Sequence, residues 1–264
     1  MQVLPWLIGV ASGLLVCLLP GDACAQAADR AGFDHSLWDK LLKANVTREG
    51  WVDYASLRGK RSGDLKAYLK SLAEADPAKL GDANAQRAFW INAYNAVCIQ
   101  TIIDAGVPAE VPHAKLFGKN IFTQRTYKVA GKVRSLDDIE HGILRKELKD
   151  PRLHAALVCG ARSCPRLRPE AFTGESLDRQ LDEESRSWIA VEKTEKGRKN
   201  YLGRGKKVFY VSMIFYWYQE DFEDSEEGVL KFVKKHADPA DREFLEKNQV
   251  TIDYLDYEWT TNKQ

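Results

Sequence analysis

The sequence predicts an α+β fold in which several helices pack on a short, mostly antiparallel sheet. Apolar residues recur at helical spacing in several long segments, as in the stretch 33–46. The segments typical of strands are short, and two of them within 121–133 are joined by a tight turn that makes a hairpin. Hydrophobic residues make up 44% of the chain, which suffices for a buried core, and no repeat or linker divides the sequence.

The first 25 residues are typical of a secretory signal peptide. Residues 4–19 are almost wholly apolar, and Ala23-Cys24-Ala25 forms an A-x-A cleavage pattern before Gln26. The apolar stretch is short for a membrane-spanning helix, so an uncleaved anchor is the weaker alternative and we expect no stable membrane span after cleavage. We therefore expect a periplasmic or secreted protein whose residues 26–264 form a single domain.

The strongest helical signal is the segment 83–105, which is followed by the helix-ending residues Gly106 and Pro108. Apolar residues surround most of it, which indicates a helix buried on nearly all sides. Asn92 and Asn95 nevertheless stand within this segment, and a buried amide without partners costs about 1–3 kcal/mol. The two side chains therefore either bond the backbone of a neighbouring loop or line a site, and the sequence leaves both alternatives open.

The remaining elements follow from local patterns and capping signals. Ser135 is expected to cap a helix that carries Glu140, His141 and Arg145, with acidic residues in its first turn. The apolar run that follows predicts a buried strand ending at Cys159. We also expect helices over 63–75, 176–189 and 238–247, strands over 153–159, 206–212 and 250–255, and an aromatic-rich turn or helix over 213–218.

Composition and motifs narrow the classes of partner. The 39 basic and 38 acidic residues nearly balance, which gives no reason to expect a nucleic-acid partner. The basic segment 203–207 lacks the spacing of a phosphate-binding loop and leads into a strand. The cysteines and histidines lack the spacing of common zinc motifs. We therefore expect no cofactor and no metal. The sequence does not identify a partner, but its composition is compatible with a small-molecule or peptide ligand.

Three of the five cysteines lie beyond the signal peptide. Cys98 falls within the apolar helix and is expected in the core. Cys159 and Cys164 flank a turn of small residues that includes Gly160 and Ser163, at the end of the predicted strand. Enzymes often place a nucleophile at such a position, where the strand fixes it and the loop exposes it. A small-loop disulfide between the two cysteines is the alternative.

Cys159 or Cys164 is the candidate nucleophile of a thiol-dependent reaction. In this hypothesis His141 is the base, and Asn95 or Glu140 orients its imidazole, because a polar third group fixes the tautomer. A cysteine at a strand end and a helical histidine beside an arginine are also common structural features. Regular strand alternation would place the side chain of His154 on the opposite face from Cys159. The residues expected to line the site, or to replace those above, are Cys164, His154, Asn92, Arg145 and Ser163.

Four separated blocks of the chain resemble the family called domain of unknown function 547 (DUF547). They are AFWINAYNA at 88–96, SLDDIEHGILR at 135–145, LVCGARSCPRLRPEAF at 157–172 and SMIFYWYQEDF at 212–222, in the order and spacing of the family. The resemblance covers a core of about residues 60–220. It implies an exported bacterial protein with no assigned reaction, and it favours Cys159 over Cys164 as the essential thiol.

The chain is more loosely similar to transglutaminase and papain-like folds. The helix end IIDAGVPAEV is similar to the transglutaminase core helix with its trailing segment, and HAALV at 154–158 is similar to the strand that bears that family's histidine. This similarity implies His154 as the site histidine. The chain departs from the family because no cysteine stands near the start of the helix, where Asn92 and Asn95 are found instead.

Together these observations predict an exported, thiol-dependent hydrolase or transferase that acts on amide or peptide bonds. The alternative is a noncatalytic module that binds a peptide or a component of the cell envelope in the same cleft.

Overall fold

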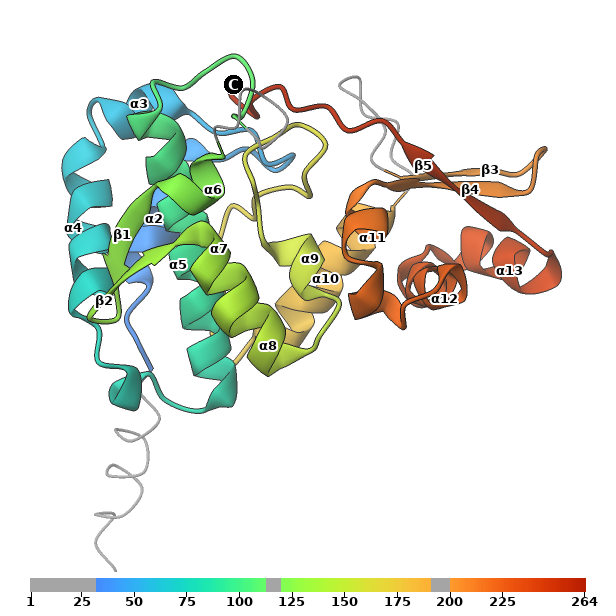
Figure 1. Ribbon diagram of the computed structural model, residues 1–264, viewed down its shortest axis with the longest axis horizontal. Helices are drawn as coiled ribbons and strands as arrows, with labels where there is room; N and C mark the ends of the chain where they lie inside the picture. Colours follow the sequence, from blue (N-terminus) through green and yellow to red (C-terminus); the bar gives the residue numbers. More distant parts are fainter. Residues whose placement is uncertain (1–31, 113–119, 191–199) are drawn as a thin grey trace, which may run out of the picture. The chain divides into compact units, whose positions relative to one another are not determined.

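The computed structural model of the chain describes residues 32–112, 120–190 and 200–264 (Figure 1). Residues 32–264 form one compact unit. Its helices and two small sheets confirm the predicted α+β class. The predicted signal peptide, residues 1–25, lies outside the described residues. Within the described part of the chain, no helix combines the length and the apolar character needed to cross a membrane.

The N-terminal part of the unit is helical, and its shorter helices pack around one long buried helix, α5 (Ala83–Asp104). Its elements are α2 (Ser36–Asn45), α3 (Tyr54–Arg58), α4 (Ser62–Glu74), a 3₁₀ turn (Pro77–Lys79) and α5. Asp82 begins α5 by accepting a hydrogen bond from the Ala85 N–H at 2.8 Å. The run from Ala88 to Ile99 on α5 is buried without interruption, as its apolar composition predicts.

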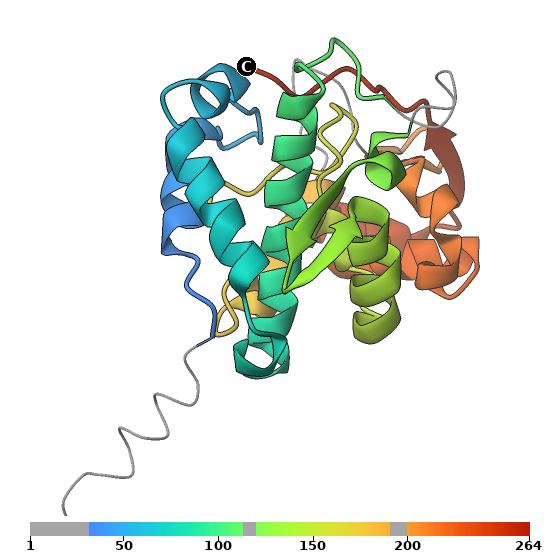
Figure 2. The same cartoon turned by 60° about the vertical axis from the view of Figure 1, so that its left-hand side comes forward.

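The predicted hairpin and the capped helix after it are both confirmed. Strands β1 (Thr126–Val129) and β2 (Lys132–Ser135) pair antiparallel. Ala130 and Gly131 turn the chain with φ values of 48° and 75°, as two-residue hairpin turns require. The hairpin lies against α4 (Figure 2). The Ala130 N–H of its turn donates a hydrogen bond to the Leu72 carbonyl of α4 at 2.8 Å.

Helix α6 (Ile121–Gln124) precedes the hairpin, and a continuous helical segment follows it. Ser135 and Asp138 form a capping box at the start of α7 (Leu136–Ile139). The segment continues as a π-helical turn (Glu140–Leu144) and as α8 (Arg145–Leu148). Single π turns inside α-helices are frequent at functional sites, and this one carries Glu140 and His141.

The prediction of a strand over residues 153–159 is wrong. Residues Leu153–Ala156 form the short helix α9, and the chain becomes extended at Leu157 without joining a sheet. A short apolar run fits a buried helix as well as a buried strand, and tertiary contacts decided between them. The strand-alternation argument that separated His154 from Cys159 therefore does not apply.

The C-terminal part contains the second sheet and the remaining helices. Strands β3 (Tyr201–Gly203) and β4 (Val208–Ser212) pair antiparallel, whereas β4 and β5 (Thr251–Leu255) pair parallel. The helices are α10 (Leu177–Ile189), α11 (Ile214–Trp217), a 3₁₀ turn (Gln219–Phe222), α12 (Glu226–His236) and α13 (Pro239–Lys247). The sheets of the described residues are thus mostly antiparallel, as predicted, with one parallel pair.

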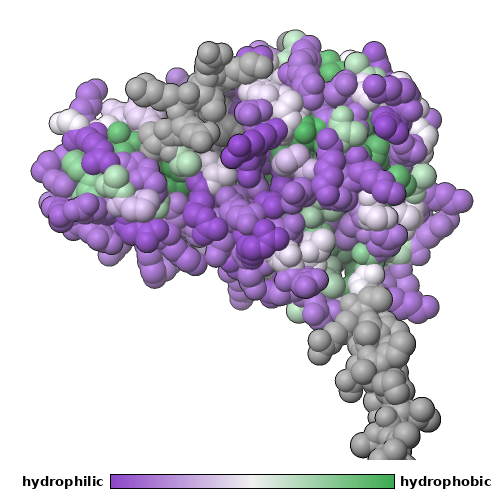
Figure 3. Space-filling view, turned by 180° about the vertical axis from the view of Figure 1, so that it is seen from behind, coloured by the Kyte–Doolittle hydropathy of each residue, from purple (hydrophilic) through white to green (hydrophobic). Residues whose placement is uncertain are grey.

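Buried side chains form two hydrophobic clusters within the described residues. The larger one surrounds α5, and the smaller one packs Trp188 and Phe215, whose rings stack at 4.4 Å, against the second sheet and α12. The face shown in Figure 3 is mostly hydrophilic, with smaller hydrophobic areas between polar side chains. This pattern is the one expected when amphipathic helices turn their apolar sides to a core.

The segment after β5 returns to the N-terminal helices (Figure 1). Thr260 bridges to Glu110, Thr261 to Ala161, and Lys263 to Val52. The last residues of the chain are thereby held along the loop that follows α9. This return brings the aromatic side chains of Tyr257 and Trp259 to the cavity wall that holds Cys159 and Cys164.

Candidate active site

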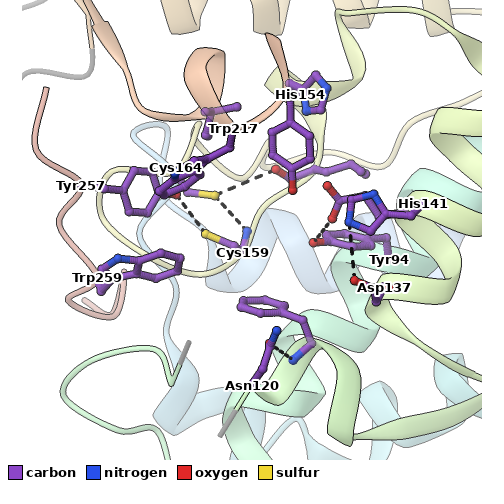
Figure 4. A pocket seen from close by; sticks show the side chains of 15 residues that line it. Tyr94, Asn120, Asp137, His141, His154, Cys159, Cys164, Trp217, Tyr257 and Trp259 are labelled. Carbon is purple, nitrogen blue, oxygen red and sulfur yellow. Dashed lines mark hydrogen bonds and ion pairs between the residues drawn. The ribbon is translucent and has the colours of Figure 1, made fainter. Parts of the chain in front are cut away.

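A cavity of about 210 Å³ lies between the loop after α9, helix α11, the π turn and the C-terminal segment (Figure 4). Thiols, imidazoles, carboxylates and aromatic rings all contribute to its walls. The lining residues are Tyr94, Asn120, Phe122, Asp137, Glu140, His141, His154, Leu157, Cys159, Cys164, Ile214, Trp217, Tyr218, Tyr257 and Trp259. The structure therefore brings together five of the residues predicted for the site: Glu140, His141, His154, Cys159 and Cys164.

Cys159 and Cys164 are not joined by a disulfide, and they lie side by side at one wall of the cavity. The Cys159 N–H points to the Cys164 sulfur at 2.9 Å, and the Cys159 sulfur lies 3.2 Å from the Tyr257 hydroxyl. Cys164 is buried, whereas Cys159 is half-buried. Burial and the neighbouring Cys164 raise the pKa of Cys159, and the Tyr257 hydrogen bond opposes this only in part. The resting Cys159 side chain is therefore a thiol rather than a thiolate.

Gly160 fixes the turn that directs Cys159 toward the cavity. Its φ is +80°, a conformation that favours glycine. A Cβ atom at this position would lie 2.1 Å from Cδ1 of Ile102 on α5. The backbone conformation therefore favours glycine immediately after the thiol, and any larger residue would also displace the Ile102 side chain.

His154 is a buried histidine whose ring is held by a carboxylate. Its Nε2 lies 2.7 Å from Asp221 Oδ2, and the same oxygen accepts a hydrogen bond from Arg145 Nε at 2.6 Å. Although burial favours the neutral acid, these two donors lower the pKa of Asp221 to about 2. Because the ionised carboxylate can only accept, Nε2 carries a proton, and Nδ1 carries the lone pair whenever the ring is neutral. The Tyr218 ring covers one face of the imidazole at 4.4 Å.

Glu140 projects from the π turn and accepts a hydrogen bond from the Tyr94 hydroxyl of α5 at 2.9 Å. Burial, together with the Glu140 charge, raises the pKa of Tyr94 well above its usual value. The same two causes raise the pKa of Tyr218. The carboxylate is thus bordered by two phenols that stay protonated and can donate hydrogen bonds.

His141, the predicted base, belongs to a different set of contacts. Its Nδ1 lies 2.9 Å from a guanidinium nitrogen of Arg145, and its Nε2 lies 3.5 Å from Asp137. The Cys159 thiol instead contacts Tyr257. Arg145 pairs with Glu220 and Asp221 and stacks over the Tyr218 ring at 4.8 Å. The structure therefore places His141 in the cavity wall without a hydrogen bond to the thiol.

Asn95 and Asn92 bond backbone groups, which is the simpler of the two alternatives left open by the sequence. Asn95 donates to the Ala156 carbonyl at 2.9 Å and accepts from the Val158 N–H at 3.0 Å. Asn92 makes the same pair of bonds with the backbone of Phe172, at 2.8 and 3.0 Å. Asn95 therefore fixes the extended chain just before Cys159 without lining the cavity.

Ser163 and Glu184 secure the loop that carries the thiols. The Ser163 hydroxyl accepts from the Glu258 N–H at 2.8 Å, which holds the C-terminal segment against the loop. Glu184 of α10 is almost fully buried and pairs with Arg166 and Arg168, each at 2.8 Å. Ser163 thus acts on the site by positioning the neighbouring Tyr257.

The main residues that sequence reasoning missed are Asp221 and Tyr257. Asp221 lies 67 positions after His154, and Tyr257 lies 98 positions after Cys159. The block 212–222 includes Asp221, but nothing in its local spacing indicated a histidine partner. Among the described residues, no group of three or more His, Cys, Asp and Glu side chains is arranged to hold a metal ion.

Comparison of the chain with known protein families finds one family model that includes part of this site. Residues 77–189 match the DUF547 family model. That model is described as a protein of unknown function, and it confirms the DUF547 resemblance over these residues. No curated protein and no solved structure matches the chain, so the similarity to transglutaminase and papain-like folds is not shown. The DUF547 segment contains Glu140, His154 and Cys159, whereas Asp221 and Tyr257 lie beyond it.

Proposed function

We propose that the protein is an exported, thiol-dependent hydrolase or transferase that acts on amide or peptide bonds. Cys159 is the nucleophile, His154 is the base, and Asp221 orients the imidazole. The observation that carries the proposal is that Cys159 and His154 line one cavity, while Asp221 holds Nε2 of the histidine ring. A thiol, an imidazole and an orienting carboxylate form the arrangement that acyl-transfer enzymes use.

In the proposed reaction the Cys159 sulfur attacks the substrate carbonyl carbon as the thiol proton passes to Nδ1 of His154. The tetrahedral intermediate collapses, the C–N bond breaks, and the imidazolium returns its proton to the leaving amine. The resulting thioester is then cleaved by water or by a second nucleophile. The raised pKa of Cys159 makes a base necessary, because little thiolate is present at neutral pH.

The structure shows the Cys159 thiol in contact with Tyr257 and not with His154. Catalytic hydrogen bonds are often long or misaligned without substrate and tighten when it binds. The assignment of His154 replaces the earlier hypothesis of His141, whose two nitrogens contact Arg145 and Asp137. The secretory signal predicted at residues 1–25 supports a periplasmic or secreted site of action.

A noncatalytic binding module is the second candidate. The observation that favours it is the contact of the Cys159 sulfur with the Tyr257 hydroxyl, in a buried setting that raises the pKa of the thiol. Under this alternative the aromatic walls bind a peptide or an envelope component without covalent chemistry. The two candidates differ in whether the sulfur of Cys159 ever becomes acylated.

The test uses p-nitrophenyl acetate as an activated acyl donor and follows release of p-nitrophenolate. We expect a saturable first-turnover burst that is lost in Cys159→Ala and slowed at least tenfold in His154→Gln. Cys164→Ala is the matched thiol control and should keep the burst. An undiminished burst in Cys159→Ala, or no burst in the folded wild type, would contradict the proposal and favour the binding module.

A further inference from the structure

We propose that the cavity recognises an ammonium or guanidinium group of the substrate through Glu140 and the ring faces of Trp217, Tyr257 and Trp259. This inference deepens the proposed function, because it names the substrate class for the same cavity. It rests on the charge of the cavity wall, on the arrangement of the rings and on the size of the space.

The wall of the cavity contains two carboxylates, and its basic side chains among the described residues are two histidines. Asp137 and Glu140 line it, and no lysine or arginine is among its described lining residues. Glu140 is bonded to the uncharged Tyr94 hydroxyl. The nearby Arg145 lies outside the lining and is already paired with Glu220 and Asp221. A carboxylate in such a wall is therefore available to pair with a cation from the ligand.

Three aromatic rings contact one another on the side of the cavity away from Asp137 (Figure 4). The ring centroids of Trp217 and Tyr257 are 4.8 Å apart, those of Tyr257 and Trp259 are 4.7 Å apart, and those of Trp217 and Trp259 are 5.9 Å apart. Trp217 is 40% exposed, which is unusual for so large an apolar side chain. Figure 4 shows the three rings grouped on the same side as Cys159.

Aromatic faces attract cations because the ring quadrupole is negative above and below the plane. Trp is the best such partner, and sites for organic ammonium groups commonly combine several rings. A neutral apolar group would also pack against the rings but would leave Glu140 without a charged partner. The combination of rings and carboxylate therefore favours a cation over a neutral or an anionic group.

The volume of about 210 Å³ limits what can enter. It is smaller than the cavities of about 300–1,000 Å³ that enclose drug-sized ligands. The space suits a cationic head group with a short carbon chain, while the rest of a substrate stays outside. Cys159 lies in the same wall as the rings, so the bound cation would place a nearby carbonyl within reach of the thiol.

The experiment measures binding of n-butylammonium, 1-butanol and butyrate by isothermal titration calorimetry. It uses Cys159→Ala, so that binding is separated from any covalent reaction. We expect n-butylammonium to bind at least tenfold more tightly than 1-butanol, and butyrate to bind most weakly. Equal binding of n-butylammonium and 1-butanol, or tighter binding of butyrate, would overturn the inference.

Glu140→Gln, added to Cys159→Ala, should weaken n-butylammonium binding about tenfold and leave 1-butanol binding unchanged. Trp259→Leu is a second variant on an independent element and should also reduce the preference for the cation. Glu258→Gln is the matched control, because this exposed carboxylate lies on the same segment but outside the cavity lining. A loss of preference in the control equal to that in Glu140→Gln would overturn the inference.

The outcomes separate this inference from the proposed function. Preferential binding of n-butylammonium without acylation of the wild type would support the cation site and contradict the enzyme. Acylation of Cys159 without any preference for the cation would support the enzyme and contradict the cation site.

Discussion

Replacing Asp221 by Asn removes the charge that holds both His154 and Arg145. The wild-type carboxyl group has a pKa of about 2, against an ordinary value of 3.8. Each pKa unit corresponds to about 1.4 kcal/mol, so the ionised form would favour folding by about 2 kcal/mol. One quarter of the side chain is exposed, so solvent screening reduces the expected loss in Asp221→Asn to about 1–2 kcal/mol at pH 7.

The sign of the pH dependence follows from the lowered pKa. The stabilisation is fully present above the unfolded-state pKa near 4 and is lost as the pH falls toward 2. Urea unfolding of the wild type and Asp221→Asn at pH 7 and pH 3 should therefore show a difference that falls to about half at pH 3. Glu220→Gln is the control, because that carboxylate also pairs with Arg145 but is 70% exposed. A difference below about 0.3 kcal/mol at pH 7, or one independent of pH, would refute the reasoning.

Three further predictions concern the thiol, the buried helix and a buried histidine. Tyr257→Phe removes the hydrogen bond that lowers the pKa of Cys159, so the pH profile of its alkylation by iodoacetamide should move to higher pH; an unchanged profile would contradict this. Asn95→Ala should lower the free energy of unfolding in urea by about 2–4 kcal/mol, and Asn92→Ala by a similar amount, because each leaves two buried backbone groups unpaired. Burial lowers the pKa of His236 to about 4, so the contribution of this histidine to wild-type stability should fall by up to about 2 kcal/mol between pH 7 and 5. His236→Gln should reduce that fall, and equal falls in both proteins would contradict the assignment.

Local sequence patterns predicted most helices because their signals are contained within each segment. The buried character of the helix Ala83–Asp104 follows directly from its apolar composition, and Ser135 caps the next long helical segment as its sequence indicates. The short helix Leu153–Ala156 was mistaken for a strand, since an apolar run of that length fits both. Its conformation depends on contacts with Asn95, which lies 61 positions away from its partner Ala156.

The site was predictable to the extent that its residues carry recognisable chemistry. Cys159, Glu140 and His154 were all named from the sequence, and the fold brings them to one cavity. The pairing of His154 with Asp221 was not predictable, because it depends on how the 3₁₀ turn Gln219–Phe222 packs beside α9. Tyr257 was missed for a related reason: the C-terminal segment returns to the loop only in the folded chain.

The central claim is that Cys159 forms a covalent acyl intermediate in this cavity. The most direct measurement is peptide mass spectrometry after rapid acid quenching of the wild-type protein reacted with p-nitrophenyl acetate. We predict one acetyl group on the peptide that contains Cys159, absent from Cys159→Ala and formed at least tenfold more slowly in His154→Gln. Acetylation confined to other residues, or acetylation of Cys159 at the same rate in His154→Gln, would contradict the account.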